Sequence, residues 1–128
     1  FTVMKFSYSK EEKLKSRKTI ETLFTDGKSV GVFPLRVFYI EGEDPQSVPL
    51  KTAVSVSKRN FKNAVDRNYI KRLLRESYRL NKHQILNALD EQKYALLFLY
   101  VGKEKPNFKE LNKTMNVLID KLIQQTKS

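Results

Sequence analysis

Residues 63–81 read NAVDRNYIKRLLRESYRLN. The side chains that recur in this stretch at helical spacing are apolar or small: Ile70, Leu73, Leu74, Ser77 and Tyr78. We therefore expect a helix over residues 63–81 that buries this stripe in the core of the protein. A second helical piece is expected over residues 82–89.

The opposite side of the predicted helix is basic. At about 100° per residue, five cations and one amide fall together: Arg67, Asn68, Lys71, Arg72, Arg75 and Arg79. The acids of the segment, Asp66 and Glu76, fall off this face, so we expect salt bridges along the helix to leave it unneutralised. Like charges four residues apart repel each other, and a bound polyanion reverses that repulsion. The face therefore indicates a nucleic-acid partner more than an ordinary solvated surface.

The charge of the whole chain agrees with this interpretation. The 128 residues carry 25 Lys and Arg against 14 Asp and Glu, which gives a net charge of +11 and a pI near 9.9. Much of the excess lies between Lys51 and Lys82. Nucleic acid is the first candidate partner and an anionic membrane surface the second. No stretch approaches the ~18 apolar residues of a membrane span, so no membrane is expected.

Strands and helices flank the basic segment on both sides. Residues 50–57 alternate apolar with small or polar side chains, which is typical of a strand. Residues 33–41 and 94–101 are rich in β-forming side chains and predict two more strands. The other expected segments are an irregular start over residues 1–15, helices over residues 16–25 and 108–126, an extra short strand over residues 28–32 and a loop over residues 41–49.

The order of these elements is α-β-β-α-β-α. It predicts an α+β fold in which one domain, residues 1–128, has a mixed central sheet with helices packed on it. The strands on either side of the long helix are expected to be parallel, because a helical crossover joins them. Met4 is a candidate natural start, with residues 1–3 lying upstream of it.

The sequence shows no pattern of a protein-based catalytic site. It has no cysteine, which excludes disulfides and thiolate metal sites and fits a cytoplasmic protein. The one histidine, His83, lies among polar neighbours and is expected on the surface. No carboxylate cluster has metal-ligand spacing, and no Ser-His-Asp set or Gly-rich phosphate loop occurs. We therefore expect no catalytic residue, metal site or organic cofactor in the protein itself.

Two neighbouring segments resemble the signature of the bacterial ribonuclease P protein family. They are SVSKR at residues 55–59 and NAVDRNYIKRLLRES at residues 63–77. The core of the signature is Arg-Asn, two residues, Lys-Arg, two residues and Arg. This chain matches it without a gap at Arg67, Asn68, Lys71, Arg72 and Arg75. Weaker similarity over residues 24–29 and 94–101 extends the resemblance over most of the chain.

The resemblance implies a protein subunit of a bacterial, cytoplasmic ribonucleoprotein. In the family the basic helix contacts ribonuclease P RNA. That RNA removes the 5′ leader of precursor tRNA by Mg²⁺-dependent hydrolysis, so the RNA is expected to hold most of the Mg²⁺. Family members have a left-handed β-α-β crossover, against the usual right-handed preference. The implied partners are ribonuclease P RNA and precursor tRNA, with no DNA.

The resemblance also implies a second set of residues, in a cleft that binds the single-stranded leader. Carried over to this chain, the set is Ile20, Phe24, Phe38, Ser57, Lys58 and Arg59. Aromatic side chains there can stack on unpaired bases. This sequence departs from the family pattern at Ile20, where an aromatic is usual, at Phe38, where tyrosine is usual, and at Tyr69, where a third basic residue is usual.

Two other functions compete with this interpretation. One is an RNA-binding or ribosome-associated protein with no catalytic partner. The other is a DNA-binding helix domain, which places its base-reading residues at the N-terminal end of the helix. In this chain the cations from Arg67 to Arg79 run along the whole face instead.

Overall fold

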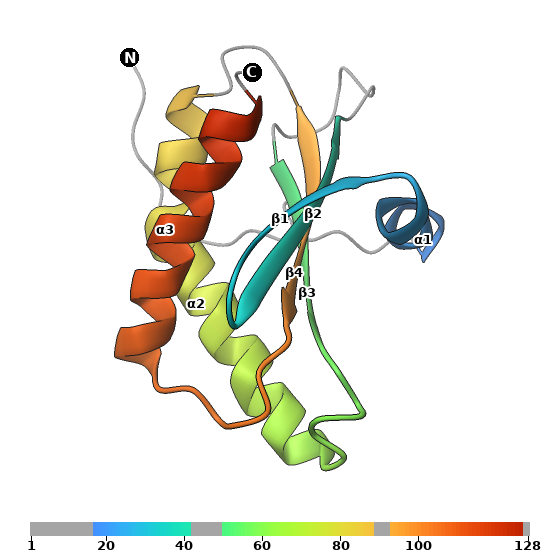
Figure 1. Ribbon diagram of the computed structural model, residues 1–128, viewed down its shortest axis with the longest axis vertical. Helices are drawn as coiled ribbons and strands as arrows, with labels where there is room; N and C mark the ends of the chain where they lie inside the picture. Colours follow the sequence, from blue (N-terminus) through green and yellow to red (C-terminus); the bar gives the residue numbers. More distant parts are fainter. Residues whose placement is uncertain (1–16, 42–49, 89–92, 127–128) are drawn as a thin grey trace.

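The computed structural model describes residues 17–41, 50–88 and 93–126. The elements in chain order are α1 (Arg17–Thr25), β1 (Lys28–Val32), β2 (Leu35–Glu41), β3 (Leu50–Val56), α2 (Ala64–Ala88), β4 (Tyr94–Tyr100) and α3 (Phe108–Thr126). Figure 1 shows α2 and α3 on one face of the sheet and α1 on the other. The predicted α+β order is confirmed, including the extra short strand β1. The irregular start expected over residues 1–15 lies outside the described residues. The loop expected over residues 41–49 does too, except for Glu41, which is the last residue of β2.

The four strands form one mixed sheet in the order β1-β2-β4-β3. A two-residue turn at Phe33 and Pro34 joins β1 to the antiparallel β2, which also pairs antiparallel with β4. Strands β3 and β4 are parallel, with Val54 opposite Phe98. Helix α2 therefore makes the expected crossover between parallel strands. The left hand of that crossover stays a prediction.

The main core lies between the sheet and the pair α2 and α3. Tyr78 of α2 packs on Phe98 of β4, with ring centroids 5.4 Å apart. The side chains that α3 buries are Leu111, Met115, Leu118, Ile119 and Leu122. They lie at helical spacing, so the apolar face predicted for residues 108–126 is confirmed, with Ile123 packed at its border.

The long helix is continuous, so the expected division into residues 63–81 and 82–89 was wrong. Helix α2 runs for 25 residues without a Gly or Pro that would interrupt it. Its buried side continues past Tyr78 through Asn81 and Lys82 to Ile85. Because Asn81 and Lys82 are polar, a pattern that counts only apolar residues does not detect that the buried stripe continues.

Asn81 sits where α2 meets α3. Its Nδ2 donates to the carbonyl of Ser77 at 2.7 Å and to Oδ1 of Asn112 at 2.8 Å. Its Oδ1 accepts from Nδ2 of Asn116 at 3.1 Å. These bonds satisfy a side chain that is 6% exposed and fix the two helices relative to each other.

Helix α1 packs on the outer face of the sheet, away from α2 and α3. Leu23 is fully buried there among Ala95 and Leu97 of β4. The helix ends before Gly27, as predicted. Glycine suits this position, because a Cβ here would lie only 2.5 Å from the Leu23 carbonyl oxygen. None of the helices in the described segments has the length and apolarity that a membrane crossing requires.

Candidate nucleic-acid interface

The basic helix begins just beyond the end of β3. Asn63 caps it, since its Oδ1 accepts from the Val65 amide at 2.9 Å. The loop between β3 and α2 carries Lys58 and Arg59, both exposed. The two basic segments of the sequence are therefore neighbours in space, at one end of the sheet.

Arg67 is half-buried and holds this loop in place. Its Nη1 donates to the carbonyls of Phe61 at 2.8 Å and Lys62 at 2.9 Å. Sequence reasoning treated Arg67 as one more cation of the face. The structure shows that Arg67 also orders the backbone from which the face begins.

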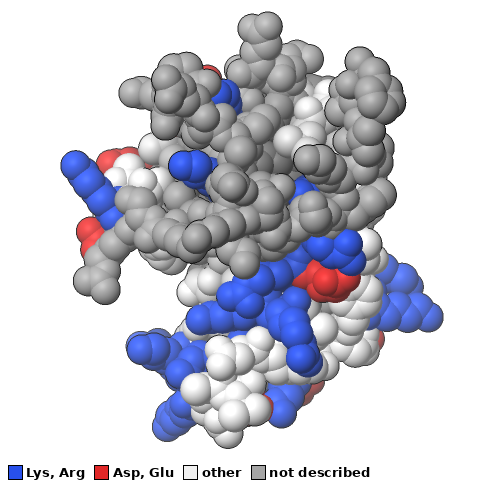
Figure 2. Space-filling view, turned by 180° about the vertical axis from the view of Figure 1, so that it is seen from behind, with Lys and Arg blue, Asp and Glu red and all other residues white. Residues whose placement is uncertain are grey.

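The other side chains of the face project from the side of α2 opposite its buried stripe. Asn68, Arg72 and Arg75 are exposed and Lys71 is half-buried. The Arg72 guanidinium carbon lies 5.8 Å from the centre of the Tyr69 ring, a cation–π contact that orients it. Figure 2 shows Lys and Arg gathered over the part of the molecule that holds the first turns of α2 and the loop before them.

One expectation about this face was wrong. Glu76 reaches Arg79 three residues along α2 and pairs with it through Nη2 and Nε. The hydrogen bond from Arg79 lowers the pKa of the Glu76 carboxyl, against the opposing effect of burial. The helical wheel places Glu76 off the basic face, but its side chain is long enough to bend back and reach Arg79. The charge of Arg79 is therefore partly neutralised. Asp66 does lie off the face, with its Oδ1 2.7 Å from Nζ of Lys105.

The C-terminal limit of the basic segment also changes. Lys82 is 2% exposed, so it does not extend the accessible basic face. His83 was expected on the surface, but it is half-buried. Both follow from the continuation of α2, which carries residues 82–88 along the sheet. The accessible cations of α2 therefore lie between Arg67 and Arg79.

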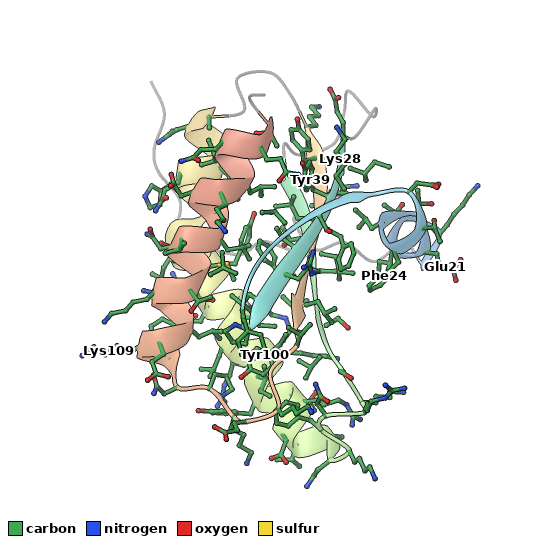
Figure 3. All side chains as sticks on the ribbon, in the orientation of Figure 1. Glu21, Phe24, Lys28, Tyr39, Tyr100 and Lys109 are labelled. Atoms are coloured by element: carbon green, nitrogen blue, oxygen red, sulfur yellow. The ribbon has the colours of Figure 1, made fainter. Side chains whose placement is uncertain are left out.

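The outer face of the sheet brings together part of the second predicted set. Ile20 and Phe38 pack beside Leu23, and Phe24 contacts Phe38 with ring centroids 5.0 Å apart. Phe24 is nevertheless 47% exposed. Figure 3 shows it projecting from α1. An accessible aromatic step thus lies between α1 and β2.

Ser57 lies farther along the same face, and Lys58 and Arg59 follow it in the loop after β3. Leu97 of β4 pairs with Phe38 of β2 on one side and with Ala53 of β3 on the other. Ser57 follows Ala53 by four residues along the chain. At about 3.3 Å per residue, this is about 13 Å along the strand. The second set is therefore divided into two parts. Ile20, Phe24 and Phe38 form the aromatic step, and Ser57, Lys58 and Arg59 form the basic corner. The Ser57 hydroxyl accepts from the Arg59 amide at 3.2 Å and shapes that corner.

Sequence reasoning missed the row of residues between these two parts. Arg36, Leu99 and Ser55 lie side by side on neighbouring strands. Arg36 is exposed, and its Nη1 donates to the Ser29 hydroxyl at 2.9 Å. The alternation of side chains along β2 places Arg36 on the same face as Phe38, and this much could have been predicted from the sequence. The pairing of Arg36 with Leu99 and of Leu99 with Ser55 could not, because it depends on the register between strands.

The sequence matches the family model described as Ribonuclease P over residues 8–123. The chain belongs to the ribonuclease P protein family. Its relatives include a ribonuclease P protein component of Porphyromonas gingivalis, 43% identical over 112 residues that cover 86% of this chain and 82% of the relative. Another, from Chlorobium phaeobacteroides, is 33% identical over 125 residues, covering 88% and 86%. Family membership makes the chain part of an endoribonuclease ribonucleoprotein that processes the 5′ end of tRNA.

Solved structures of ribonuclease P proteins share the fold. The Staphylococcus aureus protein aligns with a TM-score of 0.69 at 18% identity, covering 87% of this chain and 94% of that one. The Thermotoga maritima protein aligns with a TM-score of 0.66 at 21% identity, covering 85% and 96%. The mixed sheet with its three helices is thus the fold of these proteins.

The described residues do not assemble a metal cage. No group of three or more His, Asp or Glu side chains comes together within residues 17–41, 50–88 and 93–126. Asp66 and Glu76, the acids of the basic helix, each contact a cation instead. The chemistry that this surface offers is charge neutralisation, hydrogen bonding to phosphates and base stacking.

Proposed function

We propose that this chain binds ribonuclease P RNA through the basic face of α2 and binds the single-stranded 5′ leader of precursor tRNA across the outer face of the sheet. The observation that carries the proposal is the one-sided basic face, on which Asn68, Arg72 and Arg75 project opposite the buried stripe of α2. Phosphate contacts from such a face give affinity without requiring a particular sequence.

The outer face of the sheet is suited to a single strand. Phe24 and Phe38 offer a ring on which one base can stack, and Arg36, Lys58 and Arg59 supply cations farther along. The distance from the aromatic step to the basic corner corresponds to several nucleotides of leader. In this proposal the aromatic step fixes the position of the leader and the cations hold its backbone.

The catalytic step belongs to the RNA in this proposal. The RNA subunit holds Mg²⁺, which activates the attacking water and stabilises the leaving oxygen. The protein neutralises phosphates where RNA and substrate meet, so the complex needs less free Mg²⁺. The partners are ribonuclease P RNA and precursor tRNA, and the site of action is the bacterial cytoplasm, where tRNA is processed.

A reconstitution experiment tests the proposal against an RNA-binding protein that has no catalytic partner. The full chain is mixed with a bacterial ribonuclease P RNA and a leader-bearing tRNA at low Mg²⁺. Cleavage at the mature 5′ end should be faster than with RNA alone, and Lys71→Glu with Arg75→Glu should abolish the gain. Lys109→Glu removes the same kind of charge from the outward side of α3 and should preserve it. Cleavage no faster than with RNA alone would disprove the subunit assignment.

A further inference from the structure

A pocket of about 520 Å³ lies apart from both proposed RNA-binding surfaces. This open pocket is bounded by the β1–β2 turn, the segment after β4 and the first turns of α3. Phe33, Tyr100 and Leu111 form part of its apolar wall. Figure 3 shows Tyr100 between the hairpin turn and the lower end of α3. The volume is within the range of about 300–1,000 Å³ typical of small-molecule sites.

The mouth of the pocket carries an exposed aromatic ring. Phe33 occupies the β1–β2 turn and is 78% exposed, more than any other large apolar side chain described. The turn itself is anchored, because the Val101 amide donates to the Pro34 carbonyl at 2.8 Å. An exposed aromatic ring on an anchored turn at the edge of a pocket provides a flat surface for stacking.

The pocket carries exposed carboxylates beside two lysines, Lys103 and Lys105. Glu104 and Glu110 both line it. Burial raises the pKa of the Tyr100 hydroxyl, and the negative charges of Glu104 and Glu110 raise it further. That hydroxyl donates to the Glu104 carbonyl at 2.6 Å, so it is already engaged. The pocket therefore offers carboxylate acceptors to a ligand that carries N–H donors.

The pocket is also attached to the start of the basic helix. Asn60 donates from Nδ2 to the carbonyls of Val101 and Gly102, at 3.4 and 3.3 Å. Lys105, in the pocket wall, pairs with Asp66 of α2. Lys103, also in the wall, is exposed and available to a phosphate. The pocket wall therefore contacts the first turn of α2 and the loop before it, next to the start of the basic face.

We propose that the pocket binds one unpaired guanine of an RNA. The base stacks on Phe33, and its N1–H and N2–H groups donate side by side to the carboxylate of Glu110 or Glu104. Guanine is the base whose Watson–Crick edge presents two adjacent donors to a carboxylate, whereas adenine, cytosine and uracil present one donor group beside an acceptor. Lys103 contacts the adjoining phosphate. The proposal relies on the RNA-binding part of the proposed function but not on tRNA processing.

NMR titration of the ¹⁵N-labelled full chain tests it. The probes are the five-nucleotide RNAs UUGUU, UUAUU, UUCUU and UUUUU, and the reporters are the amides of Gly102 and Thr114 in the pocket wall. UUGUU should shift these amides and bind about fivefold to a hundredfold more tightly than the other three, as expected for one bidentate base contact. Equal affinity for all four RNAs, or shifts confined to α1 and β2, would overturn the proposal.

Three variants make the test specific. Phe33→Ala should weaken UUGUU binding and leave the fold intact, because the ring is mostly exposed. Glu104→Gln with Glu110→Gln should remove the preference for guanine, so that UUGUU and UUUUU bind with equal affinity. Lys109→Ala is the control, since Lys109 points away from the pocket (Figure 3). An arginine-containing peptide that binds there more tightly than UUGUU would instead identify a protein-binding pocket and overturn the proposal. Successful reconstitution of cleavage is compatible with any of these results, so the two proposals fail separately.

Discussion

The ring of Phe24 in α1 lies 5.0 Å from the ring of Phe38 in β2, with the two planes tilted by 56°. The neighbouring Leu23 is fully buried and attaches α1 to the sheet, whereas 47% of Phe24 remains exposed. Since Leu23 supplies the buried contact of α1, much of the Phe24 ring remains available to a ligand. The pair is therefore well placed to receive an unpaired base.

Replacing Phe24 by Ala should weaken binding of a leader-bearing precursor tRNA and leave binding of mature tRNA unchanged. Loss of one stacked base costs about 1–3 kcal/mol, or roughly fivefold to a hundredfold in Kd. The measurement is the Kd of the reconstituted ribonucleoprotein for the two RNAs. Glu21→Ala, an exposed position on the same helix, is the control. Equal weakening of both RNAs would assign Phe24 a structural role only.

Much of the basic face could be predicted from the sequence because its information is local. Helical spacing alone separates Ile70 and Leu74 from Arg72 and Arg75, and the structure places them on opposite sides as predicted. The behaviour of Arg67 and Glu76 could not be predicted in this way. Both side chains bend out of their wheel positions, one toward the carbonyls of a loop and the other toward Arg79.

The outer face of the sheet depends on contacts between distant residues, which the sequence does not reveal. Arg36 and Ser55 become neighbours only through Leu99 of β4, which is far from both in the chain. Pairing register is not encoded in the alternation of a single strand. The pocket beside Phe33 was missed for the same reason, because three separate segments form its walls.

Lys71→Ala with Arg75→Ala should weaken binding of ribonuclease P RNA and make it less dependent on salt. Removing one phosphate contact lowers the slope of log K against log salt by about 0.7–0.9. The measurement is the Kd for the RNA between low and moderate salt. A slope identical to that of the unmodified protein would show that this face does not bind phosphate. Lys109→Ala with Lys113→Ala, both exposed on α3, controls for the change in net charge.

Arg67→Ala should behave differently from Lys71→Ala. Both changes remove a cation from the face, but Arg67 also donates to the carbonyls of Phe61 and Lys62. Hydrogen bonds from charged groups contribute about 1.5–3 kcal/mol each, discounted here because part of the side chain meets solvent. Thermal unfolding should show a lower Tm for Arg67→Ala and a nearly unchanged Tm for Lys71→Ala. Equal Tm values would show that Arg67 does not stabilise the loop.

Glu76→Gln should strengthen RNA binding at neutral pH. The change removes a negative charge from the face and releases Arg79 from its ion pair. The salt slope should increase by at most about 0.7–0.9, the value of one added phosphate contact. Asp120→Asn removes the same charge from α3, where Asp120 accepts from Gln124, and should have a smaller effect.

The pKa of Glu76 provides a pH test of the same pair. Arg79 lowers this pKa below its ordinary value of 4.5. The stabilisation is therefore complete above the ordinary pKa and lost as the pH falls through the lowered one. The difference in RNA affinity between the unmodified protein and Glu76→Gln should be constant at neutral pH and disappear only below pH 4.5. A difference that persists after Glu76 is protonated would mean that the ion pair is not its cause.

Asn81→Ala should destabilise the protein far more than Asn87→Ala. Asn81 is nearly buried and links α2 to Asn112 and Asn116 of α3, whereas Asn87 is exposed on the same helix. Removing Asn81 leaves polar groups at the helix interface without their partner, which costs about 1–3 kcal/mol. Urea unfolding measures both variants. Since the interface lies on the side of α2 away from its cations, Asn81→Ala should leave the salt slope of RNA binding unchanged in the folded protein. A changed slope would show that packing against α3 helps to position the basic face.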